Sequence, residues 1–428
     1  MRGGAAPTGG WRLLALLFAA YVLSFVDRQV PSMLVEPLKR DLGIGDAQIG
    51  LLQGLGFAVV LGLTGLPLAR LMDRGVRRVL LGGGVLVWSL ATAASALAKD
   101  FTGLLLCRAG VALGEAVLTP AAHALIAERM GPRRVGLALG VYGAGAYVGL
   151  GLSYLAAGAV LAWAERVRDL AAPGLWTMSG WRLVFLAVGA PGLVLAPLLL
   201  AAARGASGPA NPPAARVRLG RPHLRAVGVV NLALGFATMA AYAVSAWAPS
   251  LLVRTFGWSV PAAGAALGPI FVGCGLAAAL AGGAAADWAA SRWPDGRLRV
   301  LGLCAFAAIP FAAVGPRLAG AGACLGALAA MIFLSSAAIS IGPSAQQAVT
   351  GPGARALVSA SGVLTVNLLG LGLGPTLVGL ATERVLKSPA ELNLALATLL
   401  PAMLAASALA ALAGLRIYRA GVADAPPP

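Results

Sequence analysis

The chain has 428 residues, of which 59% are hydrophobic and 11% charged, and its formal net charge is +17. Ordinary soluble domains carry roughly 25% charged residues, so a chain this poor in charge could not cover a surface exposed to water. Apolar runs of about 20 residues, the length that crosses a ~30 Å hydrocarbon core, recur along the whole sequence. The composition therefore excludes a soluble protein and predicts an all-α polytopic membrane protein.

Each apolar run is expected to be a helix, because none shows the two-residue alternation of a membrane barrel. The first run contains Asp27 and Arg28 and has no convincing small-residue cleavage site after it, so we expect it to remain in the mature protein. The twelve predicted spans are 11–34, 48–71, 79–98, 101–126, 134–162, 181–203, 224–250, 260–286, 299–316, 319–345, 355–382 and 391–415.

The positive charge has an uneven distribution along these spans. If the N-terminus lies inside, most of the excess of lysine and arginine falls on the inner loops and tails, as the positive-inside rule requires. The charge therefore indicates topology and not a nucleic-acid partner. We expect a multi-pass protein of the inner (plasma) membrane, with both termini cytoplasmic and membrane lipids around it, acting as a monomer.

The sequence shows no motif that is typical of an enzyme's active site. Its four cysteines lie singly inside spans, without the paired spacing of a metal site or a disulfide framework. No nucleotide loop, zinc pattern or nucleophile elbow appears outside the spans. We expect no catalytic residues, no cofactor and no metal.

The interior contains one long stretch rich in Pro, Gly, Ser and Arg, residues 204–222. It predicts a cytoplasmic linker between an N-terminal half, 1–203, and a C-terminal half, 223–428, with six spans each. The halves resemble each other, because "LPLARLMDRGVRR" follows the second span and "LAGGAAADWAASRW" follows the eighth. Two six-helix halves related by an axis along the membrane normal are one common transporter design.

The loop after the second span resembles the signature of the major facilitator superfamily, although Ala69 stands where that pattern has its first glycine. The resemblance covers essentially the whole chain and implies the twelve-helix major facilitator fold. It also implies a gate, in which an aspartate meets a positive helix end. The alternative is that this loop is a solvated basic loop that serves membrane topology alone. The candidate gating residues are Asp73, Arg74, Arg77, Arg78 and, in the second half, Asp287.

Four charged residues lie deep inside N-terminal spans, where each costs at least ~2.5–3.5 kcal/mol, and the C-terminal spans have none at that depth. At ~1.5 Å per residue, Asp27 and Arg108 lie at similar depths, roughly 12 and 10 Å from the outer ends of their helices. Glu115 follows Arg108 by two turns on the same face. Because side chains lean toward the N-terminus of their helix, Arg28 and Glu115 are expected to converge.

The four residues are therefore predicted to form a cluster between the first and fourth helices. Such acids in membranes more often mark proton or substrate paths than scaffolding, although a structural ion-pair network remains the alternative. The stretches "FVDRQVPSMLVEPLKRDLGIGDAQIGLL" and "LLLCRAGVALGEAVLTPAAHALI" resemble the Spinster branch of the superfamily. That resemblance implies coupling or substrate-binding roles for Asp27, Arg28, Arg108 and Glu115.

Three functions remain open at this point. The first is a secondary transporter that moves a small organic or lysolipid-like anion, coupled to protons. The second is an organic anion or sugar-acid symporter, because the anion:cation symporter branch shares a similar Asp-Arg and Arg…Gly-Glu-Ala pattern. The third, a membrane receptor or scaffold, is disfavoured by the near absence of soluble loops or domains.

Overall fold

The computed structural model describes residues 8–72, 76–131, 134–170, 178–203, 220–351 and 354–424. Within these ranges the chain forms helices and no strand, and twelve helical stretches are long and apolar enough to cross a membrane. Their bounds lie within a few residues of the predicted spans at most ends, whereas the seventh, predicted over 224–250, runs from Arg221 to Phe256. The prediction of an all-α protein with twelve spans is confirmed.

The helices group into two compact units. Unit 1 contains residues 1–44, 56–211 and 259–272, and unit 2 contains residues 45–55, 212–258 and 273–428. A segment of the second span thus belongs to unit 2, and a segment of the eighth belongs to unit 1. Most of the predicted linker, residues 204–219, lies outside the described residues, and the division at 204–222 stays a prediction.

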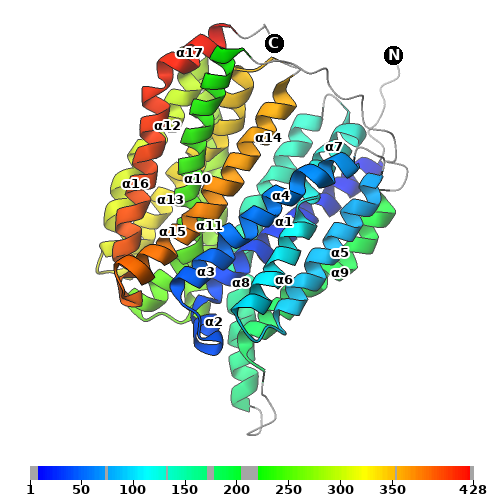
Figure 1. The fold of residues 1–428 in the computed structure, drawn as a ribbon, viewed down its shortest axis with the longest axis vertical. Coiled ribbons are helices and arrows are strands. Elements are labelled where there is room, and N and C mark those ends of the chain that lie inside the picture. The colour runs from blue at the N-terminus through cyan, green and yellow to red at the C-terminus, as the bar shows by residue number, and fades with distance from the viewer. Residues whose placement is uncertain are drawn as a thin grey trace. The chain divides into compact units, whose positions relative to one another are not determined.

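In unit 1, α5 packs along α9 and α6, and α1 packs along α8 and α9 (Figure 1). The first residues of α11 also belong to this unit. The helices are α1 (Thr8–Met33), α2 (Val35–Leu42), α4 (Leu55–Leu71), α5 (Arg77–Ser95), α6 (Phe101–Glu115), α7 (Leu118–Met130), α8 (Val135–Leu170), α9 (Gly180–Ala202) and the first part of α11 (Val260–Ala290), which continues in unit 2 from Gly273.

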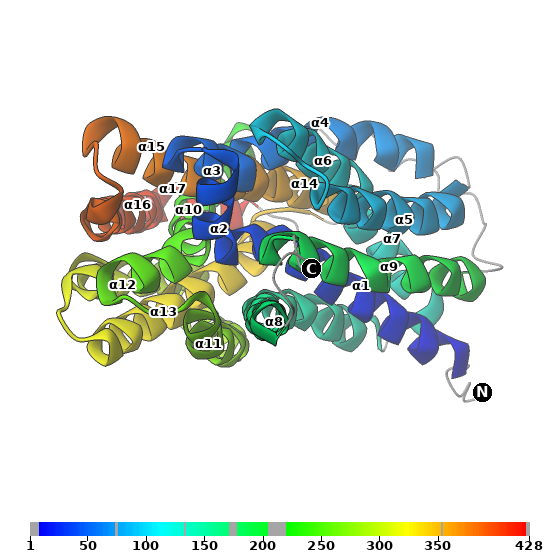
Figure 2. The same ribbon diagram turned by 90° about the horizontal axis from the view of Figure 1, so that it is seen from below.

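In unit 2, α10, α12, α13 and α16 pack side by side, and the short α17 packs on α10 (Figure 2). The helices are α3 (Asp46–Gln53), α10 (Arg221–Phe256), α12 (Gly296–Val314), α13 (Ala321–Ala348), α14 (Arg355–Thr365), α15 (Gly374–Leu380), α16 (Leu392–Ala413) and α17 (Leu415–Ala423). Two π-helical segments, η4 (Val366–Leu373) and η5 (Ala381–Val385), flank α15, and two 3₁₀ turns, Gly315–Arg317 and Pro389–Glu391, complete the unit.

The fourth span is interrupted directly after Glu115, where α6 ends and α7 begins at Leu118. The cause is Pro120, which has no N–H for the carbonyl of Ala116 and whose ring crowds that carbonyl. The break therefore places Glu115 at a helix end, in the middle of a span.

Glycines bring α8 against α1. A Cβ added at Gly149 would lie 2.4 Å from the carbonyl oxygen of Val22, and one at Gly145 would touch the rings of Phe18 and Tyr21. Small residues thus let the two helices approach closely, as in many membrane helix pairs. This contact fixes the face of α1 on which the charged residues can lie.

Candidate transport site

Arg28 and Glu115 form an ion pair between α1 and α6. The Nη2 atom of Arg28 lies 2.6 Å from a carboxylate oxygen of Glu115, and its Nε lies 3.2 Å from the same oxygen. The Glu115 side chain is 1% exposed and that of Arg28 is 12% exposed. The predicted convergence of these two residues is confirmed, and the pair is almost entirely removed from solvent.

Arg108 binds backbone and not a carboxylate. Its Nη1 donates to the carbonyl oxygen of Asp27 at 2.9 Å, and its Nη2 donates to the carbonyl of Arg28 at 3.3 Å. The Asp27 carbonyl is available because its helical partner would be the N–H of residue 31, which is proline. Pro31 thus leaves an acceptor within the membrane span, and Arg108 fills it.

The Asp27 side chain is 1% exposed and therefore buried with the other charged residues of the cluster. Its carboxylate lies near Thr92, Arg108 and Glu115 without a hydrogen bond of normal geometry. Two acids and two bases therefore meet at the junction of α1 and α6, with the Thr92 hydroxyl contributed by α5. When all four are ionised, the cluster has no net charge.

Aromatic rings form the apolar wall of this cluster. The guanidinium of Arg28 lies 4.8 Å from the ring centroid of Phe25 and 5.5 Å from that of Phe57, and Arg108 lies 4.9 Å from Phe57. Such contacts stabilise a cation in an apolar environment. Sequence reasoning missed both rings. Phe25 could have been found, since it precedes Arg28 by three residues on one helical face, whereas nothing in the sequence shows that Phe57 faces the cluster.

The candidate gating residues are only partly described. Asp73 and Arg74 lie outside the described residues. Arg77 pairs with Glu128 of α7, and Arg78 donates through Nε to the carbonyl of Leu200 at 2.6 Å. Asp287 is 75% exposed and lies 3.4 Å from Arg297. The three described residues thus make contacts inside their own units.

Unit 2 contains a polar junction of uncharged side chains. Asn231 of α10 donates to Ser361 of α14 at 3.0 Å and accepts from Gln346 of α13 at 2.6 Å. These contacts tie three helices together, so Asn231 and Gln346 have partners within the unit.

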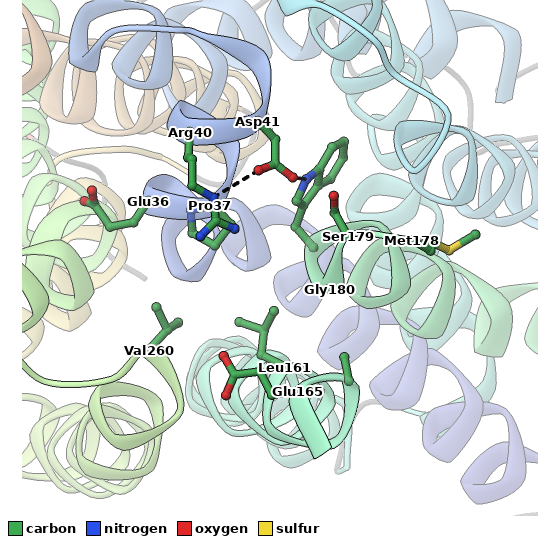
Figure 3. A pocket seen from close by; sticks show the side chains of 12 residues that line it. Glu36, Pro37, Arg40, Asp41, Leu161, Glu165, Met178, Ser179, Gly180 and Val260 are labelled. Carbon is green, nitrogen blue, oxygen red and sulfur yellow. Dashed lines mark hydrogen bonds and ion pairs between the residues drawn. The ribbon is translucent and has the colours of Figure 1, made fainter. Parts of the chain in front are cut away.

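One cavity in unit 1 has none of the four charged cluster residues in its lining. It measures about 580 Å³ and opens between α2, α8, α9 and the start of α11. Figure 3 shows Arg40 and Asp41 on one side of it and Leu161 and Glu165 on the other. Burial raises the pKa of Asp41, but hydrogen bonds from Ser179, Trp181 and Arg40 outweigh burial, so the pKa lies below its ordinary value. Asp41 is therefore ionised at neutral pH, and its contacts fasten α2 to α9.

The family model of the Major Facilitator Superfamily matches residues 17–375. The chain belongs to this superfamily. It is 30% identical over 386 residues to an MFS-type efflux pump of Mycolicibacterium smegmatis, which covers 88% of this chain and 85% of the pump. It is 29% identical over 183 residues to a probable L-galactonate transporter of Escherichia coli, with 43% of this chain and 37% of that transporter covered.

A solved structure of a bacterial homolog of the human lysosomal transporter Spinster, inward-facing and unoccupied, matches with a TM-score of 0.79. It is 25% identical and covers 98% of both chains. Together with the family match, this likeness places the protein among the major facilitator transporters of the Spinster-like branch. The chain is thus a multi-pass membrane transporter with the fold that its sequence predicted.

Proposed function

We propose that this transporter moves an anionic amphiphile, such as a lysolipid, by alternating access coupled to protons. The observation that carries the proposal is the buried Arg28–Glu115 pair, 2.6 Å apart, in a span otherwise apolar. Buried pairs contribute little to stability, so a purely structural role explains the cost of burying these charges poorly. A site that binds an anion together with a proton explains it better.

The proposed coupling follows from competition for Arg28. An acid binds a proton more readily when no cation stands beside it, and an anionic head group beside Arg28 would compete with Glu115 for that cation. Substrate binding would therefore release Glu115 to take up a proton, and loss of the proton would restore the ion pair and expel the substrate. Arg108, fixed by two carbonyls, would keep a second positive charge in place for the head group.

The proposed amphiphile is supported by the surroundings of the two arginines. Phe25 and Phe57 cover their guanidinium groups with apolar rings, which suits a ligand with both a charged head and an apolar body. The likeness to a Spinster homolog supports a substrate handled by that branch.

A sugar acid is the second candidate substrate, favoured by the match to a probable L-galactonate transporter. The same arginines would bind its carboxylate, in import with protons. In both cases we place the protein in the plasma membrane with its termini cytoplasmic, and we assign gating to Asp73, Arg74, Arg77, Arg78 and Asp287.

The test is a thermal-shift screen of purified protein with lysolipids, sugar acids and small carboxylates, followed by transport in proteoliposomes with and without a pH gradient. Stabilisation and gradient-driven transport of a lysolipid would support the leading proposal. Transport of sugar acids alone would support the second candidate. Transport that ignores the pH gradient would contradict proton coupling.

A further inference from the structure

The ion pair with Arg28 leaves one oxygen of the Glu115 carboxylate unused. The Nη2 and Nε atoms of Arg28 both donate to Oε2, while Oε1 is buried and has no hydrogen-bond partner among the described residues. A buried polar atom without a partner in a folded protein requires an explanation. Because a carboxylate oxygen can only accept, Oε1 is an atom on which Glu115 can take up a proton. That proton has to arrive through neighbouring side chains, since the oxygen is closed to solvent.

Glu115, Thr119 and His123 follow one another at intervals of four residues along the fourth span. Ala116 and Val117, between α6 and α7, keep nearly helical angles, with φ of −59° and −86° and ψ of −22° at both. The helical face therefore continues across the break, and side chains four apart on it are neighbours. At ~1.5 Å per residue, His123 lies roughly 12 Å from Glu115 along the axis, with Thr119 between them.

Tyr142 of α8 packs against this face. Its ring stacks on that of Tyr21 in α1, with centroids 4.3 Å apart, and meets the ring of His123 at 5.6 Å and an angle of 76°. Tyr142 is 1% exposed. Its hydroxyl is buried near the hydroxyl of Thr119, without a hydrogen bond of normal geometry. Buried tyrosine hydroxyls usually have a partner, so this hydroxyl is a second polar atom that requires an explanation.

His123 opens this group of side chains to solvent, because it is exposed whereas Glu115 and Tyr142 are buried. An imidazole takes up and releases a proton near neutral pH, one on each ring nitrogen. The hydroxyls of threonine and tyrosine can each donate and accept. The group thus has an exposed imidazole at one end, two hydroxyls in the middle and an unpartnered carboxylate oxygen at the buried end.

The neighbouring helices also bring charged and titratable groups to this place. The arginine nearest to each end is already paired, because Arg28 is held by Glu115 and Arg77 by Glu128. Glu115 is the acid that shares a helical face with His123, so it is the acceptor to which the series leads. The groups on the helices packed against α7 are Tyr21, Asp27 and Arg28 of α1, Arg77 of α5, Arg108 and Glu115 of α6, and Tyr142 of α8.

We propose that His123, Tyr142 and Thr119 form the route by which a proton reaches Glu115 from solvent. His123 takes a proton from water on one ring nitrogen and gives up the proton of the other. The hydroxyl of Tyr142 or Thr119 accepts that proton and passes its own to Oε1 of Glu115, through a bridging water where the distance requires one. Each O–H or N–H bond that breaks is replaced by another, so the net change is one proton moved from solvent to the carboxylate. The proposal rests on the proposed function, which assigns proton coupling to Glu115.

The route can be tested on detergent-purified protein without any substrate. Light releases protons from a caged acid, and a pH indicator follows their uptake by the protein. The uptake that belongs to Glu115 is the part that Glu115→Gln loses. The rate of that part is compared among the wild type, His123→Gln, Tyr142→Phe and the matched control His223→Gln, which removes the chain's other histidine, at the start of α10 in unit 2.

We expect His123→Gln to slow this uptake about tenfold or more, because a positioned proton-transfer group strongly accelerates the transfer. The amount taken up should not change, since Glu115 itself sets the equilibrium. Tyr142→Phe should slow the uptake less, because Thr119 offers a second hydroxyl, and His223→Gln should match the wild type. Free imidazole should restore much of the rate in His123→Ala, a recovery that a merely structural role of His123 would not produce.

Uptake by His123→Gln at the wild-type rate would overturn the route, and so would a slow His123→Ala that does not respond to imidazole. Unfolding midpoints show which variants fold, and His123→Gln keeps the test decisive if His123→Ala does not. Equal uptake by the wild type and Glu115→Gln would instead remove Glu115 as the proton carrier. A failure of the proposed function is thus distinguished from a failure of the route alone.

Discussion

At the residue scale, the charged cluster depends on backbone groups as much as on side chains. Pro31 frees the Asp27 carbonyl and Arg108 binds it, so a proline that looks like a helix defect positions a cation. Asp27 and Arg28, adjacent in sequence, face different partners: the carboxylate lies near Thr92 and Arg108, and the guanidinium binds Glu115. The two residues thus serve separate contacts.

Arg108→Lys should reduce transport about tenfold or more without unfolding the protein. Lysine keeps the charge but cannot place two fixed donors on the carbonyls of Asp27 and Arg28, and one lost charged hydrogen bond is worth about 1.5–3 kcal/mol. The measurement is initial transport rate in proteoliposomes beside the thermal unfolding midpoint. The control is Arg317→Lys, an exposed position; equal transport in both variants would count against a positioning role for Arg108.

Glu115→Gln should abolish accumulation driven by a pH gradient and spare exchange of substrate at equal pH. The amide cannot gain or lose a proton, while the remaining cluster can still bind the head group. Asp27→Asn should damage both activities if its charge keeps Arg108 in place. Counterflow and gradient-driven uptake are measured side by side, with Glu391→Gln as the exposed control. Full accumulation by Glu115→Gln would show that Glu115 is not the proton carrier.

At the element scale, the contacts made at helix ends and interruptions are not predicted by the hydrophobic periodicity of the sequence. The C-terminal helix α17 is held by Arg419, whose Nε lies 2.6 Å from Asp295, while Arg299 lies 2.8 Å from the other carboxylate oxygen. Tyr418 is fully buried and donates to the Ala345 carbonyl at 3.1 Å. This short helix therefore closes the ends of α10, α12 and α13.

Asp295→Asn should destabilise the protein by about 1.5–3 kcal/mol at neutral pH, the range for hydrogen bonds to charged groups. Burial raises the pKa of Asp295, but Arg299 and Arg419 outweigh it, so the pKa lies below the ordinary 3.8. A lowered pKa gives stability that is complete above the ordinary value and is lost as the pH falls through the folded-state value.

The difference in unfolding midpoint between wild type and Asp295→Asn should therefore be constant above about pH 5 and shrink below pH 4. Asp424→Asn, at the exposed end of α17, serves as the control and should change little. A difference that grows on acidification would contradict the ion-pair explanation.

The sequence predicted the spans and the pairing of Arg28 with Glu115, because apolar length and the lean of side chains are local properties. It did not reveal where Arg108 binds, since that contact depends on a carbonyl of another helix. Pro120 can be read from the sequence, but the end of α6 at Glu115 is known only from the helix bounds in the structure. The grouping of residues 45–55 with unit 2 could not be predicted from the sequence, because it depends on packing between helices more than 300 residues apart.

At the scale of the whole molecule, each unit contains a segment from the other part of the sequence. Residues 45–55 join unit 2 through an ion pair and a charged cap, whereas residues 259–272 join unit 1 through small residues, with Gly268 against the Gly151 carbonyl. Both junctions pack backbone against backbone, since Gly50 and Gly54 lie against the carbonyls of Pro375 and Gly372, and the first junction adds the ion pair and the cap.

Asp73→Asn should weaken transport more than substrate binding, because Asp73 is proposed to act on a gate and not in the Arg28–Glu115 site. A gating residue changes the balance between two states and so changes turnover, whereas a binding residue changes affinity directly. Asp287→Asn should have the same sign and a smaller effect, since its pair with Arg297 is exposed and such pairs are worth about 0–1 kcal/mol. Transport rate and thermal-shift affinity are measured on both variants and on Asp424→Asn. Equal losses of transport and affinity in Asp73→Asn would place that aspartate in the binding site and remove it from the gate.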